Sequence, residues 1–343
     1  MKFKKLAALS LSVVMSASML VGCSTKSTEG NSTASSDIKI GMVADLGGIN
    51  DESFNQSAWE GLQQAEKDFG IEIKVIESKQ ASEYLPNMES LIDEDVDMVI
   101  GVGYTMKEDI QKQAENYPDT QFVLIDETYD TIPENVTPIL FRENEAAYLT
   151  GLVAGKMTKT NDVGFIGGIQ TPVVSRFEYG YKAGVKEAND KANVNVQYAG
   201  TFSDAAKGKS IANQMYGNGS DIILSAAGGT GLGAIESAKE QNKYAIGVDR
   251  DQSDLAPENV LTSALKKVNV GVYDTVKEFV EGKLKGGVEK VYGLKEDGVG
   301  IPETTKNLVP QDIIDYVNSM IEKIKNDEIK VPSNEEEYKS MQK

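Results

Sequence analysis

Three side chains within residues 41–61 have the chemistry to contact a small polar ligand. Asp45 and Asn55 offer a carboxylate and an amide, which can accept or donate hydrogen bonds, and Phe54 offers a flat apolar face. A ligand that combines polar groups with a planar part would suit such a set. The segment is therefore the first candidate binding site in the chain.

The elements predicted around these residues place them at one edge of a sheet. The apolar residues of 38–45 predict a short strand, and the glycines at 47–48 let the chain turn without Cβ clashes. Asn50, Asp51 or Ser53 can then cap a helix. In open α/β sheets, ligands bind at the carboxyl ends of the strands, where this loop is expected to lie.

The same alternation of strand and helix occurs twice in the chain, which is typical of parallel sheets covered by helices. The predicted strands are residues 38–45, 71–77, 96–103 and 121–126 in the first half, and 163–168, 194–200, 221–227 and 244–249 in the second. Phe54 and Phe177 are 123 residues apart, and so are Asp126 and Asp249. Together with the length of the chain, this spacing predicts two copies of one lobe.

Two equivalent lobes that face each other across a cleft would place matching residues on opposite walls. Phe54 would then face Phe177, and Asp126 and Asp249 would occupy corresponding positions. We predict that the two rings clamp a planar ligand. The alternative is that each ring only begins the core-facing side of its helix, together with Ala58, Leu62, Ala65 and Phe69 in the first case and Tyr181 and Ala188 in the second.

Lys266 lies in a segment that is expected to cross between the lobes. Crossings are predicted near residues 140–143, 260–267 and 298–302. Several connecting segments would make a hinge that allows the lobes to open and close but restricts other relative motions. Lys266 could pair with Asp249 while both contact vicinal hydroxyls of a ligand. The alternative, one surface lysine among many, stays open from the residues alone.

Composition excludes several classes of site. The chain has no histidine and a single cysteine, Cys23, which removes Ser/His/Asp and Cys/His nucleophile arrangements and nearly all zinc chemistry. We expect no metal site, since no calcium-loop motif is present either. The net charge of −18 and the presence of only three arginines argue against a nucleic-acid partner.

Residues 1–22 predict an export signal, because lysines precede an apolar run that ends in Leu-Val-Gly-Cys. This ending resembles the bacterial lipoprotein signal, in which Cys23 is lipidated and becomes the mature amino terminus. The alternative is an ordinary secretory signal with a chance cysteine. Removal of residues 1–22 takes away three lysines and no acid, which leaves a charge of −21. Residues 23–37, rich in Ser, Thr and Gly, are expected to form a flexible tether.

A dinucleotide fingerprint offers a different function. Residues 229–234 fit G-x-G-x-x-A after an apolar strand, and Asp249 follows Gly229 by twenty residues. This would indicate an NAD-dependent oxidoreductase with the pyrophosphate on the helix start. Export, the position in the second half of the chain and a similar Gly-x-Gly at residues 101–103 argue against it. We therefore expect no enzyme and no cofactor, with the oxidoreductase as an alternative.

A longer set of residues resembles a known family. The run D-x-G-G-x-N-D-x-S-F-N-Q at 45–56 is the most specific part. The remaining matches are residues 59–61, 101–104, Asp126, Phe177, Gly180, Gly184 and residues 227–231, 247–249 and 262–267. Over essentially the whole mature chain, the sequence resembles the basic membrane lipoprotein (BMP) family, whose members bind nucleosides for ABC importers.

The resemblance implies an α/β chain with a type I periplasmic-binding-protein fold, in which two Rossmann-like lobes with parallel sheets are joined by a multi-strand hinge. Lobe 1 would comprise residues 38–141 and 267–298, and lobe 2 residues 142–266 and 299–343. It also implies a monomer, anchored by lipid at Cys23 on the extracytoplasmic face of the cell membrane, that delivers nucleosides to ABC permease subunits.

The resemblance further implies a role for each site residue. Phe54 and Phe177 would stack on the base, Asn55 and Asp126 would read its edge, and Asp249, Lys266 and Gly228 would hold the ribose, with Asp45 nearby. Tyr104 departs from the phenylalanine expected more often in the family, which leaves the choice between a purine, the predicted base, and a pyrimidine open. A sugar or autoinducer receptor of the same fold is the alternative, and it should bind free pentoses or hexoses.

Overall fold

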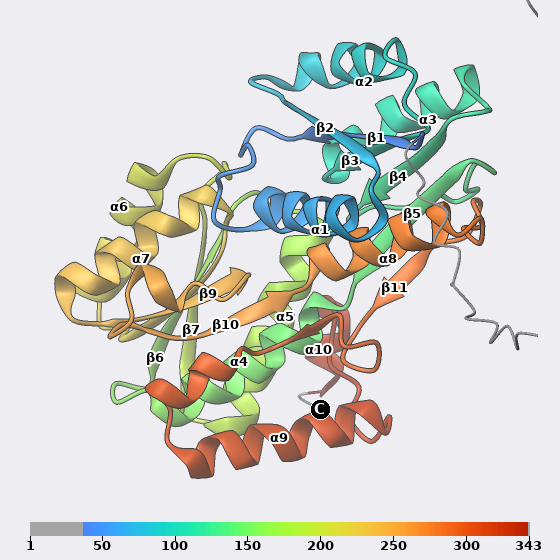
Figure 1. Ribbon diagram of the computed structural model, residues 1–343. Helices are drawn as coiled ribbons and strands as arrows, with labels where there is room; N and C mark the ends of the chain where they lie inside the picture. Colours follow the sequence, from blue (N-terminus) through green and yellow to red (C-terminus); the bar gives the residue numbers. More distant parts are fainter. Residues whose placement is uncertain (1–36, 342–343) are drawn as a thin grey trace, which may run out of the picture. The chain divides into compact units, whose positions relative to one another are not determined.

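The computed structural model describes residues 37–341, so the predicted signal peptide and Cys23 lie outside the described residues. The described part contains two six-stranded sheets with helices packed against them (Figure 1). This confirms the predicted α/β class. No helix within residues 37–341 is long and apolar enough to span a membrane.

The first sheet is entirely parallel and has the order β11-β5-β4-β3-β1-β2. Its strands are β1 (Lys39–Ala44), β2 (Glu72–Glu77), β3 (Met98–Val102), β4 (Gln121–Ile125), β5 (Val136–Phe141) and β11 (Lys290–Tyr292). The central strands are buried on both faces, as expected from their continuous apolar runs. The edge strand β2 alternates exposed and half-buried residues.

The second sheet repeats this arrangement, with the order β12-β10-β9-β8-β6-β7. Its strands are β6 (Asp162–Gly167), β7 (Asn193–Tyr198), β8 (Ile222–Ala226), β9 (Tyr244–Asp249), β10 (Val260–Lys266) and β12 (Val299–Gly300). Only β12 within this sheet runs antiparallel to its neighbour, β10. β1 and β6 hold the same place in their sheets and begin 123 residues apart, at Lys39 and Asp162.

The helices pack in pairs formed by neighbours in space. They are α1 (Phe54–Phe69), α2 (Tyr84–Ile92), α3 (Lys107–Asn116), α4 (Glu143–Met157), α5 (Pro172–Ala188), α6 (Ala205–Gly217), α7 (Gly229–Gln241), α8 (Val268–Val280), α9 (Gln311–Lys325) and α10 (Glu335–Met341). Figure 1 shows α1 beside α8, although more than two hundred residues separate their starts, and α6 beside α7. The amphipathic α9 packs against α4.

The contact between α4 and α5 is the most extensive helix pairing and depends on small residues. A Cβ atom at Gly184 would lie 2.0 Å from the carbonyl oxygen of Tyr148, and one at Gly151 would lie 2.4 Å from that of Tyr181. Backbone atoms cannot move aside as flexible side chains can. The glycines therefore allow the backbones of α4 and α5 to approach closely.

The start of α1 is capped by the side chain of Asp51 rather than by that of Ser53, the residue directly before the helix. The Asp51 carboxylate accepts hydrogen bonds from the backbone N–H groups of Ser53, Asn55 and Gln56 at 3.0, 2.9 and 3.1 Å. It thereby satisfies donors that a helix start leaves without intrahelical partners. Of the three predicted capping residues, Asp51 is the one whose side chain does this.

The chain passes between the two sheets at three places. It leaves the first sheet after β5, returns after β10 through α8, and leaves again after β11 to form β12. The predicted crossings lie close to these points. The three-residue strand β11 was not predicted, because so short a run carries no recognisable periodicity.

Candidate functional site

One cavity gathers every predicted ligand-binding residue. It is lined by Asp45, Phe54, Asn55, Asp126, Phe177, Gly228, Asp249 and Lys266. All eight lie at or near the carboxyl ends of strands from both sheets: three in the loops after β1, β4 and β8 (Asp45, Asp126 and Gly228), two as the last residues of β9 and β10 (Asp249 and Lys266), and three near the starts of α1 and α5 (Phe54, Asn55 and Phe177). The predicted location of the site at strand ends therefore agrees with where these side chains lie.

Asp126 and Asp249 terminate corresponding strands, β4 and β9, with an unusual backbone. Their φ angles are 74° and 64°, in the left-handed region that non-glycine residues seldom adopt. Such strain persists only where the surrounding structure enforces it, and it is often found at functional sites. Because both residues line the cavity, we infer that the backbone is held in this form to aim the two carboxylates.

Lys266 forms a buried ion pair with Asp126, at 2.5 Å between Nζ and Oδ2. The lysine side chain is only 3% exposed, so the alternative of a surface lysine is wrong. The predicted pairing of Lys266 with Asp249 is also wrong in this structure. Asp249 instead accepts a hydrogen bond from the hydroxyl of Ser53, because α1 brings Ser53 across from the other sheet.

Polar capacity remains in the cavity for a ligand. The Oδ1 atom of Asp126 is buried and has no hydrogen-bond partner among the described residues. The Nζ atom of Lys266 lies 4.3 Å from the ring centroid of Phe54 and 5.6 Å from that of Phe141, within cation–π range. An unpaired buried acceptor costs free energy unless a donor reaches it, and a ligand hydroxyl or amine would provide one.

Burial changes the acidity of the carboxylates. Burial raises the pKa of Asp249 to about 6, although Lys266 and the Ser53 hydroxyl oppose this change. Burial likewise raises the pKa of Asp45 to about 6 against hydrogen bonds from Gly47 and Asn55. The pKa of Asp126 is also raised by burial, in spite of Lys266. Donors on a ligand would favour the charged forms of all three.

The amide of Asn55 is already engaged within its own loop. Its oxygen accepts from the backbone N–H of Asp45 at 3.0 Å, and its Nδ2 donates to Asp45 and Asp51 at 2.7 and 3.0 Å. Asn55 therefore shapes the loop and orients Asp45 in this structure. Its role in reading a base stays a prediction.

The aromatic walls include a ring that the sequence analysis missed. Phe54 is half-buried and Phe177 is 3% exposed, and both also pack against the apolar core. Phe202, half-buried, lines the same cavity from the loop after β7, and Tyr104 lines it from the loop after β3. The sequence feature that could have revealed Phe202 is its position shortly after the end of a predicted strand, at residues 194–200.

Gly228 supplies backbone rather than side chain to the cavity wall. It has a φ of 52° and precedes the first turn of α7. A Cβ atom there would lie 3.2 Å from the carbonyl oxygen of Phe202. Glycine therefore fits both the backbone angle and the close approach at this position. Within the fingerprint-like residues 229–234, a Cβ atom at Gly233 would lie 1.8 Å from the carbonyl oxygen of Ala205, so packing against the chain accounts for that glycine without a dinucleotide.

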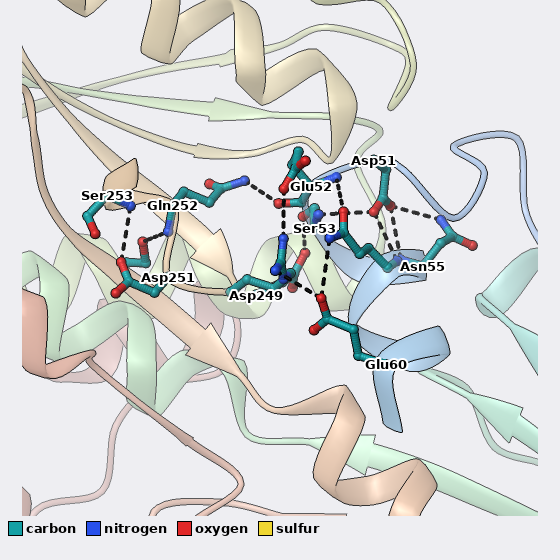
Figure 2. Close-up of polar contacts among 12 residues, drawn as sticks. Asp51, Glu52, Ser53, Asn55, Glu60, Asp249, Asp251, Gln252 and Ser253 are labelled. Carbon is teal, nitrogen blue, oxygen red and sulfur yellow. Dashed lines mark hydrogen bonds and ion pairs between the residues drawn. The ribbon is translucent and has the colours of Figure 1, made fainter. Parts of the chain in front are cut away.

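Figure 2 shows that the loop before α1 meets the loop after β9. Asp51 and Asp249, from these two places, also line the cavity. Arg250 contacts Glu52 at 2.8 Å and Glu60 at 2.9 Å, and the side chain of Gln252 donates to the carbonyl oxygen of Glu52 at 2.8 Å. The Ser53 hydroxyl donates to Asp249 in the same region. These contacts join the start of α1 to the loop after β9.

Comparison with known proteins identifies a family and relatives that match most of the chain. Residues 38–335 match the Bmp family, described as ABC transporter substrate-binding protein PnrA-like. The chain is 39% identical to the CD4+ T-cell-stimulating antigen of Listeria innocua, covering 96% of this chain and 99% of that protein. It is also 39% identical to the ABC transporter nucleoside-binding protein BmpA of Lactococcus lactis subsp. cremoris, covering 87% and 91%.

A solved structure gives the same result for the fold. The crystal structure of an ABC transporter system solute-binding protein from Aeropyrum pernix K1 matches with a TM-score of 0.81 and 27% identity, covering 89% of this chain and 96% of that one. The predicted family and periplasmic-binding fold are thus confirmed. The family consists of substrate-binding proteins that work outside the cytoplasm, not of enzymes, so the prediction that the chain is no enzyme is confirmed. This chain belongs to the Bmp family of PnrA-like ABC transporter substrate-binding proteins.

Proposed function

We propose that this protein captures nucleosides, preferentially purine nucleosides, and delivers them to the permease of an ABC importer. The observation that carries the proposal is one cavity in which aromatic rings lie together with Lys266 and the carboxylates of Asp126 and Asp249. Rings suit the base, and charged hydrogen-bonding groups suit the hydroxyls of the ribose. The similarity to a relative named as nucleoside-binding supports the same ligand class.

In the proposed complex, Phe54 forms one wall of an aromatic clamp and Phe177 the other, with Phe202 as a further ring. Phe202 supports this arrangement because it also lines the cavity and is less buried than Phe177. Asn55 and Asp126 contact the edge of the base. Asp249, Lys266 and the backbone at Gly228 hold the ribose, with Asp45 nearby.

The orphaned oxygen of Asp126 indicates how the pair with Lys266 would be used. Oδ2 of Asp126 is held by the lysine, which leaves Oδ1 for a donor on the ligand. A lysine ammonium has three donors, so Lys266 can retain this pair and still contact a ligand oxygen. Both groups are then satisfied when a nucleoside is bound, and no bond in the ligand is made or broken.

Capture proceeds by closure of two lobes around the ligand. We propose that lobe 1 comprises residues 38–141 and 267–298 and lobe 2 residues 142–266 and 299–343, with the three chain passages as the hinge. Contacts from both walls exist together only when the lobes meet, so the ligand favours the closed form that the permease recognises.

The amino-terminal segment completes the proposal. Residues 1–22 act as a lipoprotein signal, Cys23 carries lipid that anchors the protein to the membrane, and residues 23–37 form the tether. Two or more acyl chains give a stable anchor, whereas one is marginal. The protein works as a monomer at the extracytoplasmic face, where it meets the permease.

Calorimetry with guanosine, uridine and free ribose tests the proposed ligand class. We expect guanosine to bind most tightly and ribose poorly. Phe54→Ala should weaken guanosine binding by about 1 to 3 kcal/mol, the contribution of one base–aromatic stacking contact. Phe177→Ala and Phe202→Ala measure the share of each ring in the opposite wall.

Phe69→Ala is the matched control, because it removes a ring near the far end of α1 that does not line the cavity. We expect it to leave the affinity for guanosine unchanged. Unaltered affinity in the Phe54 variant would reject the clamp. Tight binding of ribose without guanosine binding would favour a sugar receptor instead.

A further inference from the structure

We propose that Arg250 is a positioning residue for the ligand site, which sets Ser53 and Asp249 in place from outside the cavity by joining the two walls. This inference rests on the proposed capture of nucleosides by lobe closure. Arg250 does not line the cavity itself, whereas its neighbour Asp249 does. Its effect on binding must therefore pass through other residues.

The contacts around Arg250 join two short segments like the rungs of a ladder. Figure 2 labels Glu52 and Ser53 on one segment and Asp249 and Gln252 on the other. On one side stand Glu52 and Ser53, and on the other Asp249 and Arg250. Ser53 donates to Asp249 and the Arg250 guanidinium contacts Glu52, so that consecutive residues pair with consecutive residues. Gln252 adds a third rung through the carbonyl oxygen of Glu52.

The guanidinium spans two carboxylates that lie on different parts of lobe 1. One nitrogen contacts Glu52 in the loop before α1 at 2.8 Å, and the other contacts Glu60 within α1 at 2.9 Å. The planar fork of arginine is suited to such paired contacts, and the compact ammonium of lysine is not. Arg250 thereby fixes the loop relative to the helix as well as lobe 1 relative to lobe 2.

A surface ion pair of this exposure usually contributes little to the stability of a fold. Here Arg250 belongs to lobe 2, whereas Glu52 and Glu60 belong to lobe 1, so the arginine separates from both carboxylates when the lobes open. Their attraction therefore favours the closed form specifically, and it brings the Ser53 hydroxyl to Asp249 in the cavity. Removal of the guanidinium should weaken ligand retention while leaving each lobe folded.

Arg250→Gln, with guanosine as the probe, tests the proposal. We expect the dissociation constant to rise about tenfold, chiefly through faster dissociation, from the loss of two partly exposed ion pairs. Arg250→Lys should recover only part of the affinity, since the two carboxylates are contacted by two different guanidinium nitrogens and lysine offers a single nitrogen on a shorter side chain. Lys283→Gln is the control, because Lys283 is an exposed cation that pairs with Glu281, two residues away in the same lobe.

Equal losses in the Lys283 and Arg250 variants would show a general charge effect and overturn the inference. So would wild-type affinity in Arg250→Gln, or full recovery with lysine. The melting temperature without ligand should stay close to that of the wild type. A large fall would indicate a structural role instead.

If guanosine does not bind the wild-type protein, the proposed function is refuted. A second measurement still tests the role of Arg250 in that case. Spin labels at Leu46→Cys and Ile169→Cys, in the full chain carrying Cys23→Ser, report the separation of the two walls. Both positions are exposed and follow the equivalent strands β1 and β6. Arg250→Gln should shift the distances toward longer values, and an unchanged distribution would refute the inference.

Discussion

Replacing Asp249 with asparagine tests how much free energy the ligand-free site costs the fold. Asp249 is buried, is bonded by the Ser53 hydroxyl and lies near Asp126 and Asp51, which are also acidic. Burial raises its pKa from 3.8 to about 6. The asparagine side chain has nearly the same shape but cannot ionise, so the substitution removes the charge and little else.

The magnitude follows from the difference between the two pKa values. A carboxylate whose pKa is about two units higher in the folded than in the unfolded chain disfavours folding by about 3 kcal/mol once it is ionised in both states. This full cost applies above pH 6. Below pH 3.8 the group is protonated in both states, and the cost vanishes.

The sign is therefore opposite to that of a carboxylate in a stabilising salt bridge. Between pH 4 and pH 6 the folded chain binds more protons at this group than the unfolded chain, so acidification stabilises the fold. Asp249→Asn lacks this dependence. Relative to the wild type, the variant should therefore become more stable as pH rises: its free energy of unfolding should increase by about 2 kcal/mol more than that of the wild type between pH 4.5 and pH 7.5.

Urea denaturation of both proteins across this pH range measures the effect. Asp254→Asn serves as the control, since Asp254 is exposed in the loop that follows β9. It reports the effect of removing one surface charge. A difference between wild type and Asp249→Asn that does not change with pH would refute the reasoning, because it would show that the carboxylate is as well solvated in the fold as outside it.

Three further substitutions test other parts of the structure. Lys266→Met leaves Asp126 buried without its partner, so it should destabilise this form of the protein by about 3 to 5 kcal/mol and abolish nucleoside binding, as measured by denaturation and calorimetry. Asp51→Ala removes the acceptor at the start of α1 and should cost about 1 to 2 kcal/mol of unfolding free energy. Gly184→Ala forces a Cβ against the carbonyl of Tyr148 and should lower the melting temperature, at a cost of about 1 to 3 kcal/mol.

Much of the fold could be predicted because it is encoded locally. The strand that ends before Asp45 and the one that ends at Asp249 both carry apolar runs with polar residues beyond them, and the structure places β1 and β9 there. The regular spacing of Phe54 and Phe177 reflected a repeated sheet order. β11 escaped prediction because its position depends on pairing with β5, a neighbour distant in sequence.

The predicted site residues all line one cavity, but the hydrogen bonds and ion pairs among them were not predicted. Which carboxylate Lys266 meets depends on how the two sheets approach each other, and sequence spacing carries no information about that distance. Nothing in the sequence indicated that the Asn55 amide would donate to Asp51. The Asp51 carboxylate accepts from this amide and from the backbone N–H groups at the start of α1, and only the folded loop brings these groups together. Phe202 was missed because no periodic pattern marks a single ring in a loop.

Several departures from local rules coincide at this cavity, and their coincidence is an argument for function. Asp126 and Asp249 hold left-handed backbone angles, an oxygen of Asp126 lacks a partner, and burial raises the pKa of both. Each feature lowers stability when considered alone. Apolar groups at these positions would cost the fold less, so the presence of polar groups here supports a ligand whose donors satisfy them.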